Sequence, residues 1–421
     1  MTGELPNDAT RDFILAHRKE DVRSLALKHA AGNVDLRMAL QQIEGWQAAA
    51  RKLPSWAATA GILYPPRLSM EQCSSEATAR YKQSVVRRWM DKPVRHASTT
   101  LADLTGGFGI DFSFLAPLFD RAIYMERQPC LCRIAGHNFR LLGLKHAEIL
   151  ETDSALRPET WPEMDCCFVD PARRDKAGRK TVALEDCEPD LGSLQKAIRD
   201  KADFCMAKLS PMLDIPTALR TLAHTAEVHA VSVQGECKEL LWVITRETPR
   251  DVTFHCVNLG TADPDFVFRK EEEAAATCLH AARPGKYLYE PNPSVMKCGG
   301  FRCVASRYGL LKLHPNTHLY TSDTLHAEFP GRVFTVETCT HFNKKELKTL
   351  LQDLPQANLT VRNFPETVER LRKRLKLKEG GEAYLFATTL ADGGHVLLRC
   401  RKADKHPHKD ISPPPQQSPC H

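Results

Sequence analysis

The sequence of 421 residues contains 15 cysteines but lacks any Cys-x-x-Cys pair. Structural zinc sites and disulfide frameworks usually show such regular spacings, and an odd number of cysteines cannot all be paired. We therefore interpret the cysteines as reduced thiols and expect no metal site. Cys205, Cys237 and Cys256 are not expected to act as thiolate nucleophiles, because none of them has a surrounding motif and a cysteine in a strand is usually a small buried apolar residue.

Long apolar runs are also absent. No stretch approaches the ~18 consecutive apolar residues of a membrane span, and the opening MTGELPNDATRDF has neither the basic flank nor the apolar run of an export signal. These absences predict a cytoplasmic protein. Apolar residues form 42% and charged residues 26% of the chain, which is typical of globular proteins, and the length suggests two to four domains.

The apolar pattern changes character along the chain. Residues 10–53 show helical spacing, whereas from residue 99 short apolar runs alternate with helical stretches, as in βαβ units of a largely parallel sheet. Seven strands are predicted, at residues 99–104, 122–125, 147–150, 166–169, 204–208, 228–233 and 240–245. The last two are too close for a crossover helix and should form an antiparallel hairpin at the sheet edge.

This pattern predicts an α/β fold with a seven-stranded Rossmann-like sheet, an N-terminal helical region and two small C-terminal α+β modules. The expected boundaries are a helical region at 1–70, the α/β domain at 71–265, α+β modules at 284–329 and 330–402, and a tail at 403–421. The tail contains ISPPPQQSP, which cannot bury enough apolar surface to fold, so we expect it to be disordered.

The densest motif is DLTGGFGID at residues 103–111, where the first predicted strand ends and a helix begins. Glycines at these positions let the backbone turn sharply and approach a ligand closely. The dinucleotide fingerprint needs a further glycine at position 112, which is Phe, and a P-loop needs a lysine that is absent here. An acidic residue precedes the glycines, and this favours a cationic ligand such as S-adenosylmethionine over a pyrophosphate. The predicted contacts from this motif are Asp103, Thr105, Gly106, Gly107, Gly109 and Asp111.

Acidic residues also follow the next three predicted strands. Glu126 could accept the ribose hydroxyls of an adenosyl group, Asp153 would lie near an adenine amine, and Asp170 follows the fourth strand. The intervals from Asp103 are each about one βα unit, so these acids should converge at the carboxyl edge of one sheet, where open α/β folds bind ligands.

These residues make the chain resemble class I S-adenosylmethionine-dependent methyltransferases, and in particular the bacterial group in which that domain precedes a ferredoxin-like segment and a THUMP-like domain. The closer resemblance rests on EQCSSEATARYK (71–82), DPARR (170–174), KLSPMLD (208–214), ECKELL (236–241), YEPNPSVMK (289–297), LYTSDTLHAEFPGR (319–332) and RNFPETVERLRKRLKLKEGGEAYLFAT (362–388). It implies a methyltransferase fold with S-adenosylmethionine as cofactor and, by analogy with THUMP modules, RNA as substrate.

The sequence leaves open which substrate atom accepts the methyl group. Base-amine methyltransferases usually carry [DN]PP followed by an aromatic residue, but here the sequence is Asp-Pro-Ala-Arg. Arg173 and Arg174 are candidate contacts for a phosphate or a base plane, or are simply solvent-facing. The order of Lys82, Asp170, Lys208 and Glu239 resembles the Lys-Asp-Lys-Glu set of FtsJ-type ribose 2′-O-methyltransferases, in which the second lysine has a lowered pKa. A structural ion-pair network is the alternative explanation, since burial and a neighbouring carboxylate shift a lysine pKa in opposite directions.

The basic excess is concentrated near the C-terminus. The whole chain has a net charge of +6, and residues 331–402 contain fourteen basic and eight acidic side chains, which equals that excess. Six of nine consecutive positions are cationic within a predicted helix that ends at Gly380 and Gly381: Arg370, Arg372, Lys373, Arg374, Lys376 and Lys378. This density suits a phosphate backbone, although a solvated helix face would look the same. An RNA methyltransferase is therefore the leading hypothesis; a non-catalytic RNA-binding protein and a protein or small-molecule methyltransferase are the alternatives.

Overall fold

The computed structural model describes residues 5–27, 32–91, 98–173 and 184–405. The chain divides into two compact units, the first formed by Met1–Val231 with Lys238–Phe254 and the second by Ser232–Cys237 with His255–His421. Each unit is described separately below. The predicted disorder of the tail concerns mainly residues 406–421, which lie outside the described residues.

The first unit begins with a helical region, as predicted. Its elements are α1 (Asp8–His17), α2 (Val22–Ala26), α3 (Leu36–Lys52), α4 (Pro54–Ala58), α5 (Arg67–Gln72) and α6 (Glu76–Met90). Helix α3 begins where the Asp35 side chain accepts the Met38 N–H, and Ser75 caps α6 through the Thr78 N–H. Helix α6 is not among the predicted elements, although Tyr81, Val85 and Trp89 recur at helical spacing in its sequence.

A mixed sheet follows, and its strands confirm all seven predicted ones with ends shifted by at most four residues. They are β1 (Thr100–Asp103), β2 (Arg121–Glu126), β3 (Ala147–Glu151), β4 (Met164–Val169), β7 (Ala202–Leu209), β8 (Thr225–Val233) and β9 (Glu236–Thr245). Within the first unit their order is β8-β9-β7-β4-β1-β2-β3. Strands β3, β2, β1, β4 and β7 are parallel, whereas β9 is antiparallel to β7.

The predicted hairpin is present at β8 and β9, but it is not at the sheet edge, because β10 (Thr253–Leu259) and β11 (Phe266–Arg269) continue the sheet beyond β8 and bring it to nine strands. Strands β8 and β9 are neighbours in the sheet and are joined by Gln234 and Gly235, both with positive φ, as a tight two-residue turn requires. Strands β3, β2, β1, β4 and β7 of the same sheet are parallel, so their carboxyl ends all lie at one edge.

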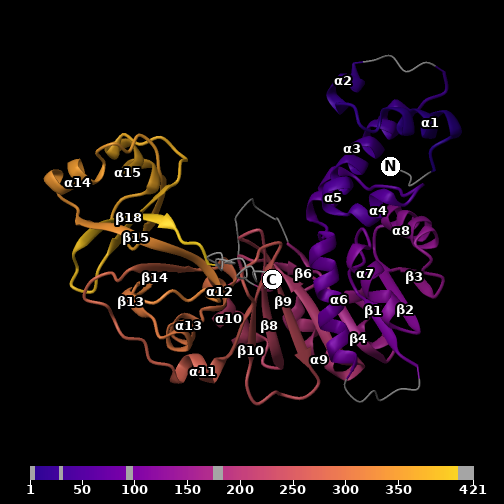
Figure 1. Ribbon diagram of the computed structural model, residues 1–421. Coiled ribbons are helices and arrows are strands. Elements are labelled where there is room, and N and C mark those ends of the chain that lie inside the picture. The colour runs from indigo at the N-terminus through magenta and orange to yellow at the C-terminus, as the bar shows by residue number, and fades with distance from the viewer. Residues whose placement is uncertain (1–4, 28–31, 92–97, 174–183, 406–421) are drawn as a thin grey trace, which may run out of the picture. The chain divides into compact units, whose positions relative to one another are not determined.

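Helices flank this sheet (Figure 1). They are α7 (Ile110–Leu115), α8 (Pro129–Leu141), α9 (Leu191–Lys201) and α10 (Ile215–Thr221), with short 3₁₀ turns at Ala116–Leu118, Ser154–Leu156, Pro158–Thr160 and Leu184–Asp186. A two-stranded hairpin, β5 (Ala172–Arg173) with β6 (Cys187–Glu188), follows β4. It was not predicted, since two-residue strands leave no periodic signal in a sequence.

The helical region packs onto the glycine loop of the sheet. Phe108, from the middle of that loop, meets the Trp56 ring edge-on at a centroid distance of 5.0 Å, and Tyr64 lies beside both in one buried cluster. Asn138 of α8 bonds the backbone of Leu63 in both directions, at 2.9 and 2.8 Å. The loop after β1 is therefore fixed from outside as well as by its own turns.

The second unit holds a different, seven-stranded sheet with the order β13-β14-β12-β15-β18-β17-β16. The elements of this part of the chain, of which β10 and β11 do not belong to the seven-stranded sheet, are β10 (Thr253–Leu259), β11 (Phe266–Arg269), α11 (Lys270–Ala275), β12 (Tyr287–Pro291), α12 (Pro293–Cys298), α13 (Phe301–Tyr308), β13 (Leu311–His314), β14 (Thr317–Ser322), β15 (Gly331–His341), α14 (Lys344–Leu350), β16 (Asn358–Arg362), α15 (Val368–Leu375), β17 (Ala383–Thr389) and β18 (His395–Lys402). Strand β12 pairs antiparallel with β15, so the two expected α+β modules share one continuous sheet.

The basic helix α15 differs from its prediction at one end. Its apolar stripe consists of Leu371, which is fully buried, and of Val368 and Leu375, which are partly buried. The helix ends at Leu375 with Lys376 in the left-handed conformation (φ 56°), several residues before Gly380 and Gly381. A C-terminal cap of that conformation is usually glycine, so the glycine pair was the stronger but misleading signal.

Candidate active site

The glycine loop between β1 and α7 closes on the end of β2. The Gly106 N–H donates to the Met125 carbonyl at 2.8 Å, and the Gly107 N–H donates to Glu126 Oε2 at 2.9 Å. Gly107 and Gly109 have φ values of 58° and 83°, in the left-handed region that favours glycine. The residues of the motif therefore satisfy a backbone requirement that larger side chains would not meet.

Gly106 is constrained by space rather than by φ. A Cβ at this position would lie 2.4 Å from the Tyr124 ring. That ring cannot move aside freely, because its hydroxyl donates to the Gly107 carbonyl and its face packs against Phe112 and Phe139.

We predict that Gly106→Ala destabilises the first unit by about 1–3 kcal/mol through this overlap. Thermal unfolding is the measurement. Gly136→Ala is the matched control, since Gly136 lies inside α8 and its added methyl would meet only the tip of Ile149 at 3.3 Å; there alanine should be neutral or slightly stabilising. Equal stability of both variants and the parent would contradict the packing argument.

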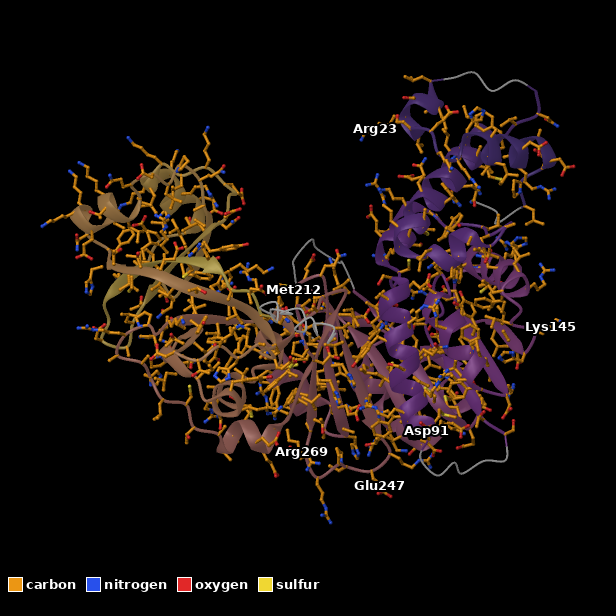
Figure 2. All side chains as sticks on the ribbon, viewed as in Figure 1. Arg23, Asp91, Lys145, Met212, Glu247 and Arg269 are labelled. Atoms are coloured by element: carbon orange, nitrogen blue, oxygen red, sulfur yellow. The ribbon has the colours of Figure 1, made fainter. Side chains whose placement is uncertain are left out.

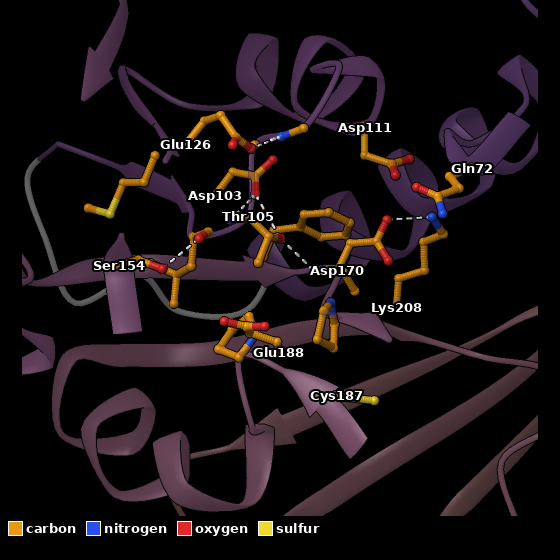
Figure 3. Close-up of a pocket in the computed structure, with 18 of the residues that line it drawn as sticks. Gln72, Asp103, Thr105, Asp111, Glu126, Ser154, Asp170, Cys187, Glu188 and Lys208 are labelled. Carbon is orange, nitrogen blue, oxygen red and sulfur yellow. Dashed lines mark hydrogen bonds and ion pairs between the residues drawn. The ribbon is translucent and has the colours of Figure 1, made fainter. Parts of the chain in front are cut away.

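Four acidic side chains from successive strand ends line one cavity, as the sequence predicted; Figure 3 shows three of them, Asp103, Glu126 and Asp170. Asp103 is 2% exposed and accepts the Thr105 N–H at 2.9 Å. Burial, followed by the nearby carboxylates of Asp111, Asp170 and Glu126, raises the pKa of Asp103 well above its ordinary value despite that hydrogen bond. This position favours a positive charge beside it.

The other strand-end acids keep well-defined orientations. Glu126 accepts the Gly107 N–H through Oε2 and the Gln128 N–H at 2.7 Å through Oε1. Asp153 Oδ1 accepts the Ala155 N–H at 3.1 Å, and its Oδ2 lies 3.8 Å from the Arg127 guanidinium. Each carboxylate oxygen can accept a second hydrogen bond, so both side chains remain able to bind a ligand.

Thr105 connects the ends of β1 and β4. Its hydroxyl accepts the Asp170 N–H at 2.7 Å and lies 3.4 Å from Asp103 Oδ1. Beyond it, the Ser154 hydroxyl donates to the Leu104 carbonyl at 2.6 Å. These bonds fix the relative positions of the acids.

The cavity itself measures about 1000 Å³, at the upper end of the range for small-molecule sites. Its walls combine the glycine loop, the ends of β2, β3, β4 and β7, the β5–β6 hairpin and the α5–α6 connection. The prevailing carboxylates fit a cationic nucleoside and oppose a phosphate-bearing one.

The Lys-Asp-Lys-Glu residues also come together, but in two pairs. Lys82, with no exposed surface, lies 2.7 Å from Glu239 Oε1 and 3.1 Å from Asp111 Oδ1, and donates to Ser74 Oγ at 3.0 Å. Ser74 in turn donates to Asp111 Oδ2 at 2.7 Å. The sequence missed Ser74 and the attachment of Asp111 to Lys82, because both depend on where the unpredicted helix α6 lies.

The second pair joins Lys208 Nζ to Asp170 Oδ2 at 2.5 Å. Burial lowers the pKa of Lys208, but Asp170, Asp111 and Glu239 raise it by more, so the net shift is upward. The resemblance to FtsJ-type enzymes implied a lowered pKa here; the direction is the opposite, because three carboxylates face this ammonium.

The remaining predicted contacts lie elsewhere or outside the description. Arg173 belongs to β5, but its side chain and all of Arg174 lie outside the described residues. On α15, Arg372 donates to the Ala357 carbonyl at 3.1 Å, while Arg374 pairs with Glu366 and lies over the Phe342 ring at 4.8 Å. Three exposed lysines that the sequence analysis did not single out lie on α14: Lys344, Lys345 and Lys348.

Helices α14 and α15 share one face of the second sheet. Leu347 and Leu350 from α14, and Leu371 from α15, are buried in the same cluster with Leu385 and Leu397 of β17 and β18. Nitrogen-tipped side chains project outward from this part of the chain (Figure 2). The two helices therefore combine their cations on one surface. Among the described residues, no helix has the length and apolar composition needed to cross a bilayer.

Comparison with known proteins agrees with this architecture. Residues 287–330 match a family model described as a ferredoxin-like domain, and residues 331–402 match one described as THUMP domain-like. The chain is 27% identical over 310 residues, 71% of its length and 80% of the relative's, to uncharacterized S-adenosylmethionine-dependent methyltransferases from two strains of Mycobacterium tuberculosis.

A solved structure extends the similarity over nearly the whole chain. The crystal structure of a protein from Porphyromonas gingivalis W83, described as a methyltransferase, superposes with a TM-score of 0.82 at 35% identity, covering 95% of this chain and 100% of that one. S-adenosylmethionine is thus the cofactor. The chain belongs to the family of class I S-adenosylmethionine-dependent methyltransferases whose catalytic domain is followed by ferredoxin-like and THUMP-like domains.

Proposed function

We propose that this methyltransferase acts on RNA, and that it binds its cofactor along the carboxyl edge of β1, β2 and β3. The observation that carries the proposal is the pairing of an acidic cavity in the first unit with a strongly cationic, THUMP-like surface in the second. The first suits a cationic nucleoside, and the second suits a phosphate backbone.

The cofactor contacts follow from the geometry of the acids. Glu126 would accept the ribose hydroxyls of the cofactor, Asp153 would lie near its adenine, and the glycine loop would border the nucleoside. Asp103 is the buried acid that would lie near the positive charge of the cofactor. When bound, the cofactor supplies an electrophilic methyl group, and Asp170 at the end of β4 borders the space into which that group would point. Asp111, Lys82 and Glu239 act behind the cavity wall by holding the charged network in place.

The RNA contacts assigned here are the exposed cations of α14 and α15. Arg370 and Lys373 are exposed, and the lysines of α14 lie on the same face of the sheet. Phosphate neutralisation by such groups makes binding fall with salt, by about 0.7–0.9 in log–log slope for each phosphate.

We predict that Arg370→Ala with Lys373→Ala weakens binding to structured RNA and lowers the magnitude of the salt slope by about one to two. Fluorescence anisotropy across a salt series measures both quantities. Lys145→Ala with Lys196→Ala removes the same charge from exposed positions of the first unit and should leave the slope unchanged. An equal loss in both double variants would show that only total charge matters.

Methyl transfer itself tests the function. The purified full chain is incubated with S-adenosylmethionine tritiated in the methyl group and total RNA from a strain that lacks the gene. We expect label in RNA that ribonuclease releases. Label confined to protein or to small molecules would place the substrate in another class and overturn the proposal.

A further inference from the structure

The charge of the cavity restricts which group can enter to be methylated. Among the described residues that line it, nine are acidic and three are basic. The acidic side chains are Asp103, Asp111, Glu126, Asp153, Asp170, Asp186, Glu188, Asp190 and Glu239; the basic ones are Arg127, Lys208 and Lys238. Counted over the described residues alone, the carboxylates remain in excess even with buried Lys82 and a cofactor of about one net positive charge added.

Two of the three lining cations are already engaged by carboxylates. Lys208 is bound to Asp170, and Arg127 Nη1 lies 2.8 Å from Glu188 Oε1. A phosphate next to the reacting atom would therefore be desolvated beside several carboxylates. A ribose 2′-hydroxyl is the acceptor that suffers most from this, because a phosphate is attached to the adjacent 3′ oxygen.

The acid–base properties of Lys208 and Asp170 also argue against a hydroxyl as the accepting group. A hydroxyl is a poor nucleophile at neutral pH and needs a strong base beside it. Lys208 cannot supply one, since the surrounding carboxylates hold it as an ammonium that donates to Asp170. Asp170 is the group available to a substrate: its side chain is 36% exposed, whereas that of Lys208 is 12% exposed.

We propose that the accepting atom is an uncharged exocyclic amine nitrogen of an RNA base, turned out of its stack into the cavity and hydrogen-bonded to the Asp170 carboxylate. This rests on the proposed function and specifies its substrate atom. The nitrogen lone pair forms the bond to the methyl carbon while the carbon–sulfur bond breaks, and the electron pair of that bond stays on sulfur. The nitrogen becomes positively charged and passes its proton to Asp170, which releases it to solvent.

Lys208 and Gln72 would support an amine acceptor in different ways. Lys208 is a positioning residue, because it fixes one oxygen of Asp170 and leaves the other for the amine. Gln72 lies on the same side of the cavity as Asp111 and Lys208 (Figure 3), and a carboxamide offers both a donor and an acceptor to the edge of a base. When a base is turned out of its stack into the cavity, the phosphates that flank it stay outside the acidic interior.

The experiment locates the transferred methyl group. RNA labelled by the full chain is divided between alkaline hydrolysis and complete digestion to nucleosides with mass spectrometry. We expect label in mononucleotides after alkali and a nucleoside whose added mass stays with the base on fragmentation. Label in alkali-stable dinucleotides would mean ribose methylation and overturn this inference while leaving RNA as the substrate. A methyl group on a ring nitrogen or on a base carbon, identified by comparison with standard nucleosides, would also overturn it, and absence of label from RNA would overturn the proposed function as well.

Variants test the assignment of the proton. Asp170→Asn keeps a hydrogen-bond acceptor but cannot take a proton, so its transfer rate should fall about 10²-fold or more, while a tritiated-cofactor binding assay shows little change. The groups that face the Lys208–Asp170 pair are Lys82, Asp103, Asp111, Glu239 and the Cys73 thiol. With Asp170 as proton acceptor, the parent rate should not increase from neutral pH to about pH 10. A rate that climbs through this range in the parent, and is flat in Lys208→Met, would assign the proton to Lys208 instead.

Discussion

Replacing Glu126 with alanine should weaken binding of S-adenosylmethionine about a hundredfold. The proposed role of this carboxylate is to accept both ribose hydroxyls, and hydrogen bonds to a charged group contribute about 1.5–3 kcal/mol each. Alanine also frees the Gly107 and Gln128 N–H groups that Glu126 now holds, so the loop over the nucleoside loses its anchor. Isothermal titration calorimetry measures the dissociation constant directly.

Two further variants separate these causes. Glu126→Gln keeps an oxygen acceptor and should lose less affinity than alanine. Glu151 pairs in register with Glu126 at the end of β3 but is exposed and does not line the cavity; Glu151→Ala should bind the cofactor as the parent does. An unchanged dissociation constant for a well-folded Glu126→Ala protein would remove Glu126 from the site.

Replacing Lys82 with methionine should destabilise the first unit by about 3–5 kcal/mol, because it leaves the buried carboxylates Asp111 and Glu239 without their shared cation. Methionine keeps much of the lysine volume, so lost packing contributes little. The free energy of unfolding from urea titration is the measurement. Lys196→Met is the control, since Lys196 pairs with Asp200 on the exposed face of α9 and its loss should matter little.

The deficit of Lys82→Met should depend on pH. In the parent, burial raises the pKa of both carboxyls while Lys82 and Lys208 lower it, so that the net shift is downward for Asp111 and upward for Glu239. Without Lys82 the folded-state pKa of Asp111 should rise above its unfolded value and that of Glu239 should rise further, so the folded variant binds protons more readily than the unfolded chain and its deficit is larger at neutral pH than at acidic pH. It should shrink as pH falls toward about 4, where the unfolded carboxyls also protonate. A deficit that is constant with pH would assign the effect to packing.

The strands and the convergence of acids at one cavity could be predicted from sequence because they follow local rules. Each buried parallel strand reads as a short apolar run, and an acid directly after such a run must lie at the carboxyl edge of the sheet. Asp103, Glu126, Asp153 and Asp170 needed only this argument to be brought together.

The network behind the cavity could not be predicted in the same way. Ser74 and Asp111 join Lys82 only because α6 lies against α7, and the apolar pattern of one helix does not encode which other helix it packs against. The direction of the Lys208 pKa depends on three carboxylates from different elements, and such a sum requires coordinates. The shared sheet of the two C-terminal modules depends on long-range pairing of β12 with β15, which single-segment patterns do not encode.

A crystal structure of the full chain with S-adenosylhomocysteine tests the central claim most directly. The account predicts the ribose hydroxyls within hydrogen-bond distance of Glu126, the adenine beside Asp153, and the sulfur facing the space bordered by Asp170. A nucleoside bound away from the strand ends, or one whose ribose makes no contact with Glu126, would contradict it.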